Sequence, residues 1–204
     1  MGLPFTLEPD GSPACAVRES EGVIVATAAA KTDMFVDPGA APGASVPDAG
    51  RLLGTPPPGD FRFSARVSVN FASTFDAGVL LVYAGDRHWA KLCYEYSPQR
   101  VPTAVSVVTR GSSDDCNSFE TDGSPLWMRV TRTGAAWAFH ASRDGAYWRL
   151  LRYFTFGDAA ALEGALGAVR IGLMPQSPTG DGCAVTFDEL TFTPGAPADL
   201  RDGT

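Results

Sequence analysis

The amino-acid sequence predicts an all-β fold, an antiparallel sandwich or barrel with at most one short helix. Three observations predict it. Short runs of apolar and β-branched residues recur at roughly regular spacing. These runs are separated by Gly, Pro, Asp and Ser, and helical periodicity is nearly absent. The 204 residues fit a single domain, 1–204, and the hydrophobic content of 45% is that of a globular protein with a substantial core.

The expected strands differ in how they pattern their side chains. Residues 61–69 alternate strictly, with Phe, Ala and Val on one face and Arg and Ser on the other. Residues 78–84 are continuously apolar, which is typical of a strand covered on both faces. The other expected strands cover 22–29, 88–96, 104–110, 126–133, 135–142, 147–154, 168–174 and 183–192.

Four segments are expected to lie outside the strands. Asp144-Gly145 is a strong signal for a tight hairpin turn. A short helix is expected from Asp158 to Leu166, with Asp158 as its N-cap. Residues 37–60 are rich in Pro, Gly and Ala and predict a long surface loop, and residues 194–204 predict a frayed tail outside a core of about 20–193.

Charge and hydropathy exclude several classes of partner. The formal net charge is −7 and the sequence pI is about 4.7, so neither a nucleic acid nor an anionic membrane is an expected partner. The first residues lack the pattern of a secretory signal, and no apolar run is long enough to span a bilayer. We expect a cytoplasmic protein, and the edges of a sandwich are compatible with a monomer or a homodimer.

The four cysteines, Cys15, Cys93, Cys116 and Cys183, show no CxxC spacing, so a zinc site is not expected, and neither is another metal or a cofactor. In a reducing compartment they are expected to be free thiols. A Cys15–Cys183 disulfide between terminal strands stays open as the alternative.

Strand parity brings polar groups together in residues 88–96. Trp89, Lys91 and Glu95 point to one face, together with Cys93, because side chains at i and i+2 share a face. The strand is expected to be central, since hydrophobic strands flank it. A mixed strip of this kind suits the floor of a ligand site, and an ordinary solvated face is the alternative.

Two polar segments follow apolar strands. After Thr109, the residues Ser113 and Asp114 either belong to a tight turn or stand at the rim of the face that carries Lys91. Gln176 and Ser177 lie in a second polar loop, for which a turn shaped by Pro and Gly is the alternative.

Six segments occur in an order and spacing that resemble the YesU-like family of single-domain proteins, which includes the yeast protein named for regulation of enolase. They are residues 32–35, 75–83, 88–96, 106–115, 142–152 and 174–190, so the resemblance covers about 32–192. It implies a concanavalin-A-like lectin/glucanase jelly roll with a concave sheet face. The family pattern also matches the pairs Thr32-Asp33 and Ser113-Asp114, and Trp89, Lys91 and Glu95.

These residues lead to three hypotheses of function. The first is a small-molecule or sugar site on the concave face, where Trp89 stacks on the ligand and polar groups bind its hydroxyls. The second is an enzyme, either an isomerase, lyase or cyclase or a glycoside hydrolase, with Glu95 and Asp114 as acid and base. The third is a regulatory protein-binding module. The expected ligand-binding residues are Asp33, Trp89, Lys91, Glu95, Thr109, Ser113, Asp114, Gln176 and Ser177.

Overall fold

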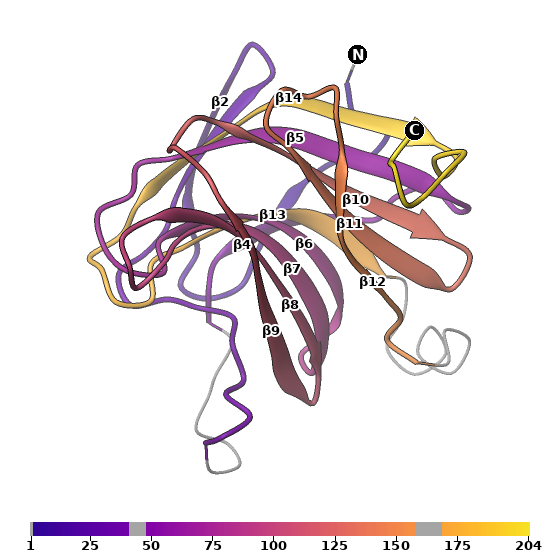
Figure 1. Cartoon of the computed structure of the whole chain (residues 1–204). Helices are drawn as coiled ribbons and strands as arrows, with labels where there is room; N and C mark the ends of the chain where they lie inside the picture. The colour runs from indigo at the N-terminus through magenta and orange to yellow at the C-terminus, as the bar shows by residue number, and fades with distance from the viewer. Residues whose placement is uncertain (1, 41–47, 158–168) are drawn as a thin grey trace.

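The computed structural model, which describes residues 2–40, 48–157 and 169–204, is a sandwich of two antiparallel sheets (Figure 1). The predicted all-β jelly-roll class is confirmed. The first sheet has the order β1 (Glu8–Asp10), β4 (Arg51–Gly54), β13 (Arg170–Gln176), β6 (Ala77–Gly85), β7 (His88–Tyr96), β8 (Pro102–Arg110) and β9 (Ser112–Glu120). The second has the order β12 (Arg149–Phe154), β11 (Ala136–Ser142), β10 (Leu126–Thr133), β5 (Phe61–Val69), β14 (Ala184–Pro194), β3 (Val23–Thr27) and β2 (Ala16–Ser20).

The main core lies between the two sheets and follows from strand parity. On β5 the side chains of Phe61, Phe63 and Val67 are buried in it, while the arginines and serines between them face outward. β7 contributes Leu92 and Tyr94 from the opposite sheet. Burial of each large apolar side chain contributes about 1.5–3 kcal/mol, so this layer supplies most of the driving force for folding.

A second buried apolar cluster lies on the outer face of the first sheet. It contains Leu81, Trp89, Val107 and Met174, and it is covered by residues 32–36, which we call the covering segment. One end of this segment forms a bridge from Thr32 to Ser177, just beyond β13. Its other end meets β9, where the backbone N–H of Ser113 donates to the Val36 carbonyl over 2.8 Å. The covering segment therefore runs across the first sheet and leaves only part of the outer face open.

All ten strands predicted from the sequence are present, and the structure adds four others. β4 lies within residues 37–60, so the prediction of one continuous loop there was wrong for residues 51–54. β9 occupies residues 112–120, where a turn was one of the alternatives. Before the expected core, β1 pairs with β4 and β2 pairs with β3. The helix expected at 158–166 falls outside the described residues.

The expectation of a frayed tail was wrong. β14 continues to Pro194, and the residues after it dock on the second sheet. His140 Nε2 lies 2.8 Å from the carbonyl oxygen of Leu200, and the Arg129 guanidinium donates to the Gly203 carbonyl over 2.7 Å. Hydrogen bonds from a buried histidine and a half-buried arginine hold this segment in place. The Pro, Gly and Asp content of the segment gives no indication of these contacts.

The structure can also be compared with the predictions made for the hairpin at Asp144, for the cysteines and for the membrane. The hairpin at Asp144 is confirmed as the connection of β11 and β12, although it takes six residues, with Asp144 Oδ1 accepting from the backbone of Ala146 and Tyr147. All four cysteines are free, so the alternative Cys15–Cys183 disulfide is not formed. Within the described ranges no helix is long and apolar enough to cross a membrane, and the cytoplasmic location stays a prediction.

Gly172 on β13 has no side chain, which allows β4 to lie very close to β13. A Cβ at this position would lie 1.7 Å from the backbone oxygen of Leu52 on β4. We expect Gly172→Ala to lower the free energy of unfolding by about 2 kcal/mol or more, because the clash is with backbone and the strand pair must separate. Urea denaturation measures the change.

Gly39→Ala is the matched control, because a Cβ there would meet only the Asp37 carboxylate, at 3.4 Å. It should change the free energy of unfolding by no more than about 0.5 kcal/mol. Equal stabilities for the two variants would contradict the close approach of β4 and β13.

Candidate functional site

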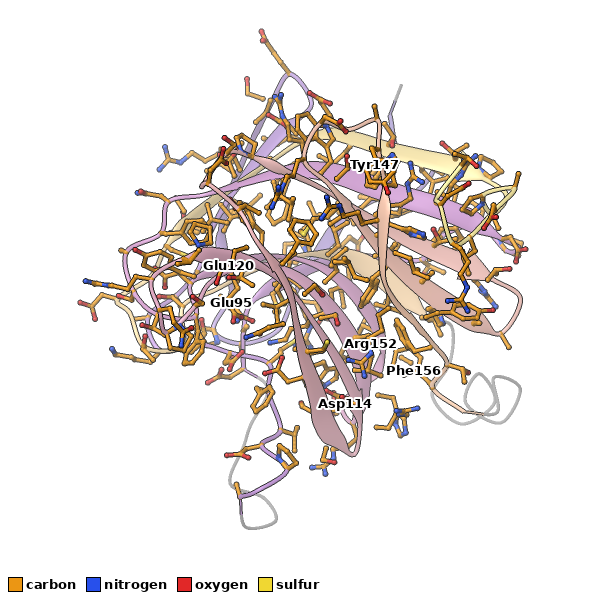
Figure 2. All side chains as sticks on the ribbon, in the orientation of Figure 1. Glu95, Asp114, Glu120, Tyr147, Arg152 and Phe156 are labelled. Atoms are coloured by element: carbon orange, nitrogen blue, oxygen red, sulfur yellow. The ribbon has the colours of Figure 1, made fainter. Side chains whose placement is uncertain are left out.

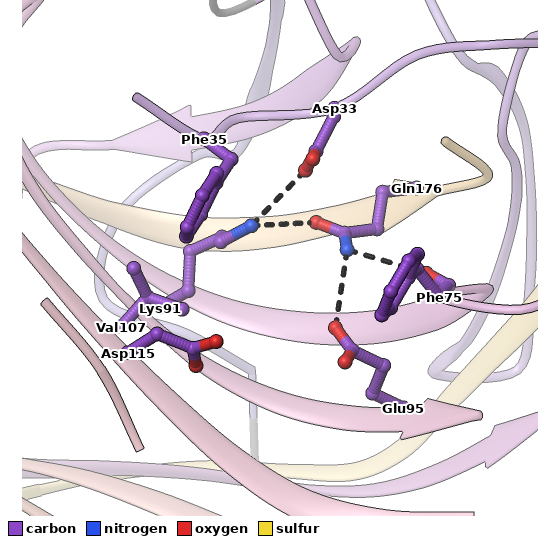
Figure 3. A pocket seen from close by; sticks show the side chains of 8 residues that line it. All are labelled: Asp33, Phe35, Phe75, Lys91, Glu95, Val107, Asp115 and Gln176. Atoms are coloured by element: carbon purple, nitrogen blue, oxygen red, sulfur yellow. Dashed lines mark hydrogen bonds and ion pairs between the residues drawn. The ribbon is translucent and has the colours of Figure 1, made fainter. Parts of the chain in front are cut away.

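A buried lysine lies at the centre of the outer face of the first sheet. Lys91 is on β7, between β6 and β8, and it is only 2% exposed. Its ammonium group donates to Asp33 Oδ1 over 3.1 Å and to Gln176 Oε1 over 2.9 Å (Figure 3). A buried ammonium needs partners of this kind, because desolvation without them costs several kcal/mol.

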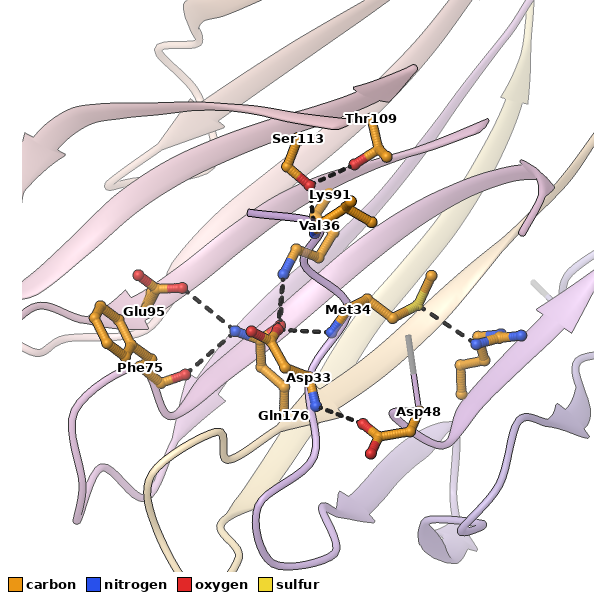
Figure 4. A network of polar contacts seen from close by, with 11 residues as sticks. Asp33, Met34, Val36, Asp48, Phe75, Lys91, Glu95, Thr109, Ser113 and Gln176 are labelled. Atoms are coloured by element: carbon orange, nitrogen blue, oxygen red, sulfur yellow. Dashed lines mark hydrogen bonds and ion pairs between the residues drawn. The ribbon is translucent and has the colours of Figure 1, made fainter. Parts of the chain in front are cut away.

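The two partners of Lys91, Asp33 and Gln176, come from distant parts of the chain. Asp33 belongs to the covering segment, and its Oδ1 also accepts from the backbone N–H of Met34 over 2.6 Å. Its own N–H donates to Asp48 Oδ1 over 3.0 Å (Figure 4). Burial lowers the pKa of Lys91, but the negative charges around it, chiefly that of Asp33, outweigh burial and raise the pKa overall. The lysine is therefore charged and fixed in place.

Gln176 connects this ion pair to a second carboxyl group. While Gln176 Oε1 accepts from Lys91, its Nε2 donates to the Phe75 carbonyl over 3.3 Å and to Glu95 Oε2 over 3.4 Å. Both ends of the amide are thereby used, which sets its orientation. Lys91, Gln176 and Glu95 form one polar chain along the floor of the site.

The Glu95 carboxyl is protonated at neutral pH. Burial raises its pKa to about 8, with Lys91 opposing the rise and Asp33 and Asp115 adding to it. The pKa of Asp115 is also raised, again chiefly by burial. The site thus holds a carboxylic acid that can donate a hydrogen bond or a proton, and a further carboxyl group, Asp115, on the edge strand β9.

These groups line a pocket of about 220 Å³ on the part of the face that the covering segment leaves open. Two aromatic side chains form its sides: Phe35 lies beside Lys91, and Phe75 lies near Gln176 and Glu95 (Figure 3). The lining residues are Asp33, Phe35, Phe75, Lys91, Glu95, Val107, Asp115 and Gln176. Polar groups and aromatic surface converge in one concave site, as is typical of small-molecule sites.

Phe75 is held in an unusual backbone conformation. Its φ is +68°, in the left-handed region that bulky residues rarely adopt, and the residue is 37% exposed. The backbone N–H of Phe75 donates to the Tyr96 carbonyl over 2.7 Å, and its own carbonyl accepts from Gln176. Strained positions of this kind cluster at functional sites, where neighbouring contacts maintain them.

Of the residues predicted from the sequence, Asp33, Lys91, Glu95 and Gln176 come together at the pocket. Asp114 does not. Its carboxylate lies 2.7 Å from the Arg152 guanidinium of β12 (Figure 2), and its cross-strand partner on β8 is Val108, in the main core. Asp115 pairs with Val107, and Val107 pairs with Lys91, so Asp115 shares their face.

The other residues predicted to bind a ligand pack against or bond to the rest of the protein instead of lining the pocket. Trp89 is fully buried beneath the covering segment, so its ring is not open to a ligand. The hydroxyls of Thr109 and Ser113 share a hydrogen bond of 2.9 Å, and Ser113 Oγ accepts from the Val36 backbone over 2.9 Å. Ser177 donates to Asp76 Oδ1 over 2.6 Å. These groups hold the covering segment and the loops in place.

Sequence reasoning missed Phe35, Phe75, Val107 and Asp115. A signal existed for Asp115, since continuing strand parity through a tight hairpin at Gly111 places it on the Lys91 face. Phe35 and Phe75 lie outside regular strands, where no periodic pattern indicates the direction of a side chain. Among residues 2–40, 48–157 and 169–204, no group of three or more His, Cys, Asp or Glu side chains is arranged to hold a metal ion.

Comparisons with known proteins support the fold and assign a family. Residues 12–195 match a family model described as a protein of unknown function, DUF1349. The YesU-like name expected from the sequence stays a prediction. A search of curated proteins found no match.

Solved structures similar to this one share its fold at low sequence identity. A functionally unknown protein from Saccharomyces cerevisiae has a TM-score of 0.76 and 22% identity, over 94% of this chain and 98% of that one. The GH43 protein BlXynB from Bacillus licheniformis has a TM-score of 0.71 and 15% identity over 96% of this chain, which spans only 37% of that protein. An alginate lyase from Klebsiella pneumoniae has a TM-score of 0.54 and 13% identity, over 88% and 84%.

The raised pKa of Glu95 predicts a specific dependence of stability on pH. The unfolded carboxyl titrates near its usual value of 4.5 and the folded one near 8, so between these values the unfolded state binds fewer protons. Stability contributed by this group is therefore present below about pH 4.5 and is lost as the pH rises toward 8. Glu95→Gln should remove this loss, making the variant more stable relative to wild type at pH 8 than at pH 5 by at least about 1 kcal/mol.

Urea denaturation across this pH range measures the difference. Glu19→Gln, at an exposed position on β2, is the control and should show no such trend. A difference between Glu95→Gln and wild type that does not change with pH would contradict the protonated state of Glu95.

Proposed function

Because the chain belongs to the DUF1349 family of proteins of unknown function, we propose its function from the pocket itself: it binds a small, neutral, polyhydroxyl molecule such as a sugar. The observation that carries this proposal is the joining of two aromatic side chains, Phe35 and Phe75, with a fixed set of hydrogen-bonding groups in one pocket. Sugar rings present apolar C–H faces between equatorial hydroxyls, so they fit both kinds of surface.

The polar groups provide what hydroxyls need. Each hydroxyl donates one hydrogen bond and accepts others. Protonated Glu95 offers a donor, the Gln176 amide oxygen and the Asp115 carboxylate offer acceptors, and Lys91 offers a donor beyond its two bonds to protein. Since Lys91 and Gln176 are already held by other residues, little side-chain freedom is lost when a ligand binds.

Charge favours a neutral ligand over an acidic one. Of the charged groups that line the pocket, Lys91 and Asp33 form an ion pair, and Asp115 adds a further negative charge. Glu95 is protonated at neutral pH and adds none. An acidic sugar would meet the Asp115 carboxylate without a free cation in the lining to balance it.

The size of the pocket favours a single sugar ring in it. Its volume of about 220 Å³ is below the roughly 300–1,000 Å³ of sites for drug-sized ligands. Similar structures include a protein whose name contains xylan, a polysaccharide of neutral sugars. At its sequence identity this likeness concerns the fold alone, so the ligand class is argued from the pocket, with this name as additional support.

Two neighbouring aspartates provide a sharp test. Asp115→Ala should weaken binding of a neutral monosaccharide about tenfold or more, because a hydrogen bond to a charged group contributes roughly 1.5–3 kcal/mol. Asp114→Ala should leave the affinity unchanged, because that carboxylate points to Arg152. Isothermal titration calorimetry with a panel of pentoses and hexoses measures both.

The result that would contradict this proposal is equally clear. If no sugar of the panel binds, or if the two alanine variants weaken binding equally, the pocket is not the sugar site. Both aspartates lie on the edge strand β9 and outside the two apolar clusters, so both variants are expected to fold.

A second candidate function is catalysis, and the protonated state of Glu95 favours it. A carboxylic acid that keeps its proton at neutral pH can serve as a general acid, as a hydrolase, lyase or isomerase acting on a small metabolite would require. Asp114 was the partner expected from the sequence, and in the pocket Asp115 takes that place. Lys91 would stabilise negative charge that develops on the substrate.

Incubation of the protein with p-nitrophenyl glycosides of neutral sugars tests for glycosidase activity. If the protein is such an enzyme, nitrophenol is released, and Glu95→Gln reduces the rate at least about a hundredfold, since general acid catalysis contributes factors of roughly 10²–10⁴. NMR of the unmodified sugars detects isomerisation or elimination in the same way. Sugar binding without turnover by either measurement would leave binding as the function.

Two other expectations stay predictions. One is a regulatory role through binding another protein, and the other is assembly into a homodimer. Both would use other surfaces of the protein, so the pocket does not test them. Size-exclusion chromatography with light scattering measures the oligomeric state directly.

A further inference from the structure

A second pocket lies on the same face of the first sheet, beside the Lys91 pocket. Its volume is about 370 Å³, and it is lined by Ser97, Gln99, Thr103, Asn117, Ser118, Phe119 and Glu120. These residues come from β8, β9 and the turn between β7 and β8. No step of the proposed function uses them.

Strand register shows that the two pockets are neighbours. Glu95, in the first pocket, pairs across the sheet with Thr103, in the second, and Thr103 pairs with Glu120. On β9, Asp115 lines the first pocket and Asn117 lines the second. Residues at i and i+2 lie on one face about 7 Å apart, a separation comparable to the length of one sugar residue.

The position of the covering segment determines which part of the outer face stays open. This segment crosses from Ser177 beyond β13 to Ser113 at the start of β9, and both pockets lie on the same side of it. On that side the outer face continues along β7 from Lys91 to Glu95, and Thr103 connects Glu95 to Glu120 across the sheet. The two pockets therefore form consecutive parts of one surface rather than unrelated depressions.

The chemistry of the second pocket also suits a neutral sugar. Gln99 and Asn117 offer amides that can donate and accept hydrogen bonds, and the Ser97 hydroxyl can donate. The Thr103 hydroxyl already donates to the Val101 carbonyl, so it can only accept. Phe119 lies at the edge of the pocket, with its ring packed against the main core and Arg143 stacked over it at 5.1 Å. Arg143 also donates to the Glu120 backbone carbonyl, which fixes this edge of the pocket. Among the described lining residues, Glu120 carries the charge, so an acidic ligand is again disfavoured.

We propose that the two pockets are adjacent subsites for a neutral oligosaccharide, with one sugar residue in the Lys91 pocket and the next beside Asn117. This proposal rests on the proposed function and specifies its ligand as a chain of at least two sugars. A linked second sugar adds contacts without paying again for the loss of free translation and rotation, so its affinity should exceed that of the single sugar.

Calorimetry with matched pairs of sugars tests the proposal. The pairs are xylose and xylobiose, glucose and cellobiose, mannose and mannobiose, and galactose and galactobiose. For the pair that binds, we expect the disaccharide to bind at least about tenfold more tightly than its monosaccharide. Asn117→Ala should reduce this ratio at least about threefold.

Cys116→Ala is the matched control. Cys116 precedes Asn117 on the same exposed edge strand, but it pairs with Ser106 and points to the other face. It should leave the ratio unchanged. A parallel titration with an oligomannuronate, an acidic chain, should give weaker binding than any neutral disaccharide that binds.

The outcomes separate this proposal from the proposed function. If a monosaccharide binds but its disaccharide binds no more tightly, or if the ratio survives Asn117→Ala, the second subsite is refuted and the first pocket stands. If neither member of any pair binds, the proposed function fails and the second subsite fails with it.

Discussion

The outer face of the first sheet is organised around the burial of one charge, that of Lys91. An ammonium group placed on a strand with neighbours on both sides must be compensated, or it would be expelled or lose its proton. Compensation comes from Asp33, which lies almost sixty residues earlier in the chain, and from Gln176, which lies much later. The lysine therefore links segments that strand pairing alone does not connect.

Much of the local architecture depends on this link. Asp33 can reach Lys91 only if residues 32–36 lie across the sheet, and their burial of Trp89 and Met174 then closes the second apolar cluster. The polar chain continues through Gln176 to Glu95 and to the carbonyl of Phe75, whose backbone adopts the left-handed conformation. Stability and site geometry are thus joined: the contacts that compensate a buried charge also position the groups that face the pocket.

The parts of this arrangement that follow simple periodicity could be predicted from the sequence. Alternation on β5 and the polar strip of β7 gave the fold class and the shared face of Lys91 and Glu95. β9 could not be identified in this way, because it is an edge strand with little buried surface and no apolar alternation. Its register decides which of two adjacent aspartates enters the pocket, so the prediction of Asp114 as the site carboxylate failed by one residue. The burial of Trp89 was equally hidden, since nothing local shows that a distant segment will cover a strand.

The central claim is that a neutral sugar binds in the Lys91 pocket against Phe75. Saturation-transfer difference NMR on a mixture of neutral pentoses and hexoses tests it most directly, because it reports which sugar protons lie close to the protein. We predict signals from the ring protons of at least one sugar, their loss in Phe75→Ala, and their persistence in Tyr147→Ala, at an exposed aromatic residue that does not line the pocket. No signal from any sugar, or equal signals in wild type and Phe75→Ala, would contradict the claim.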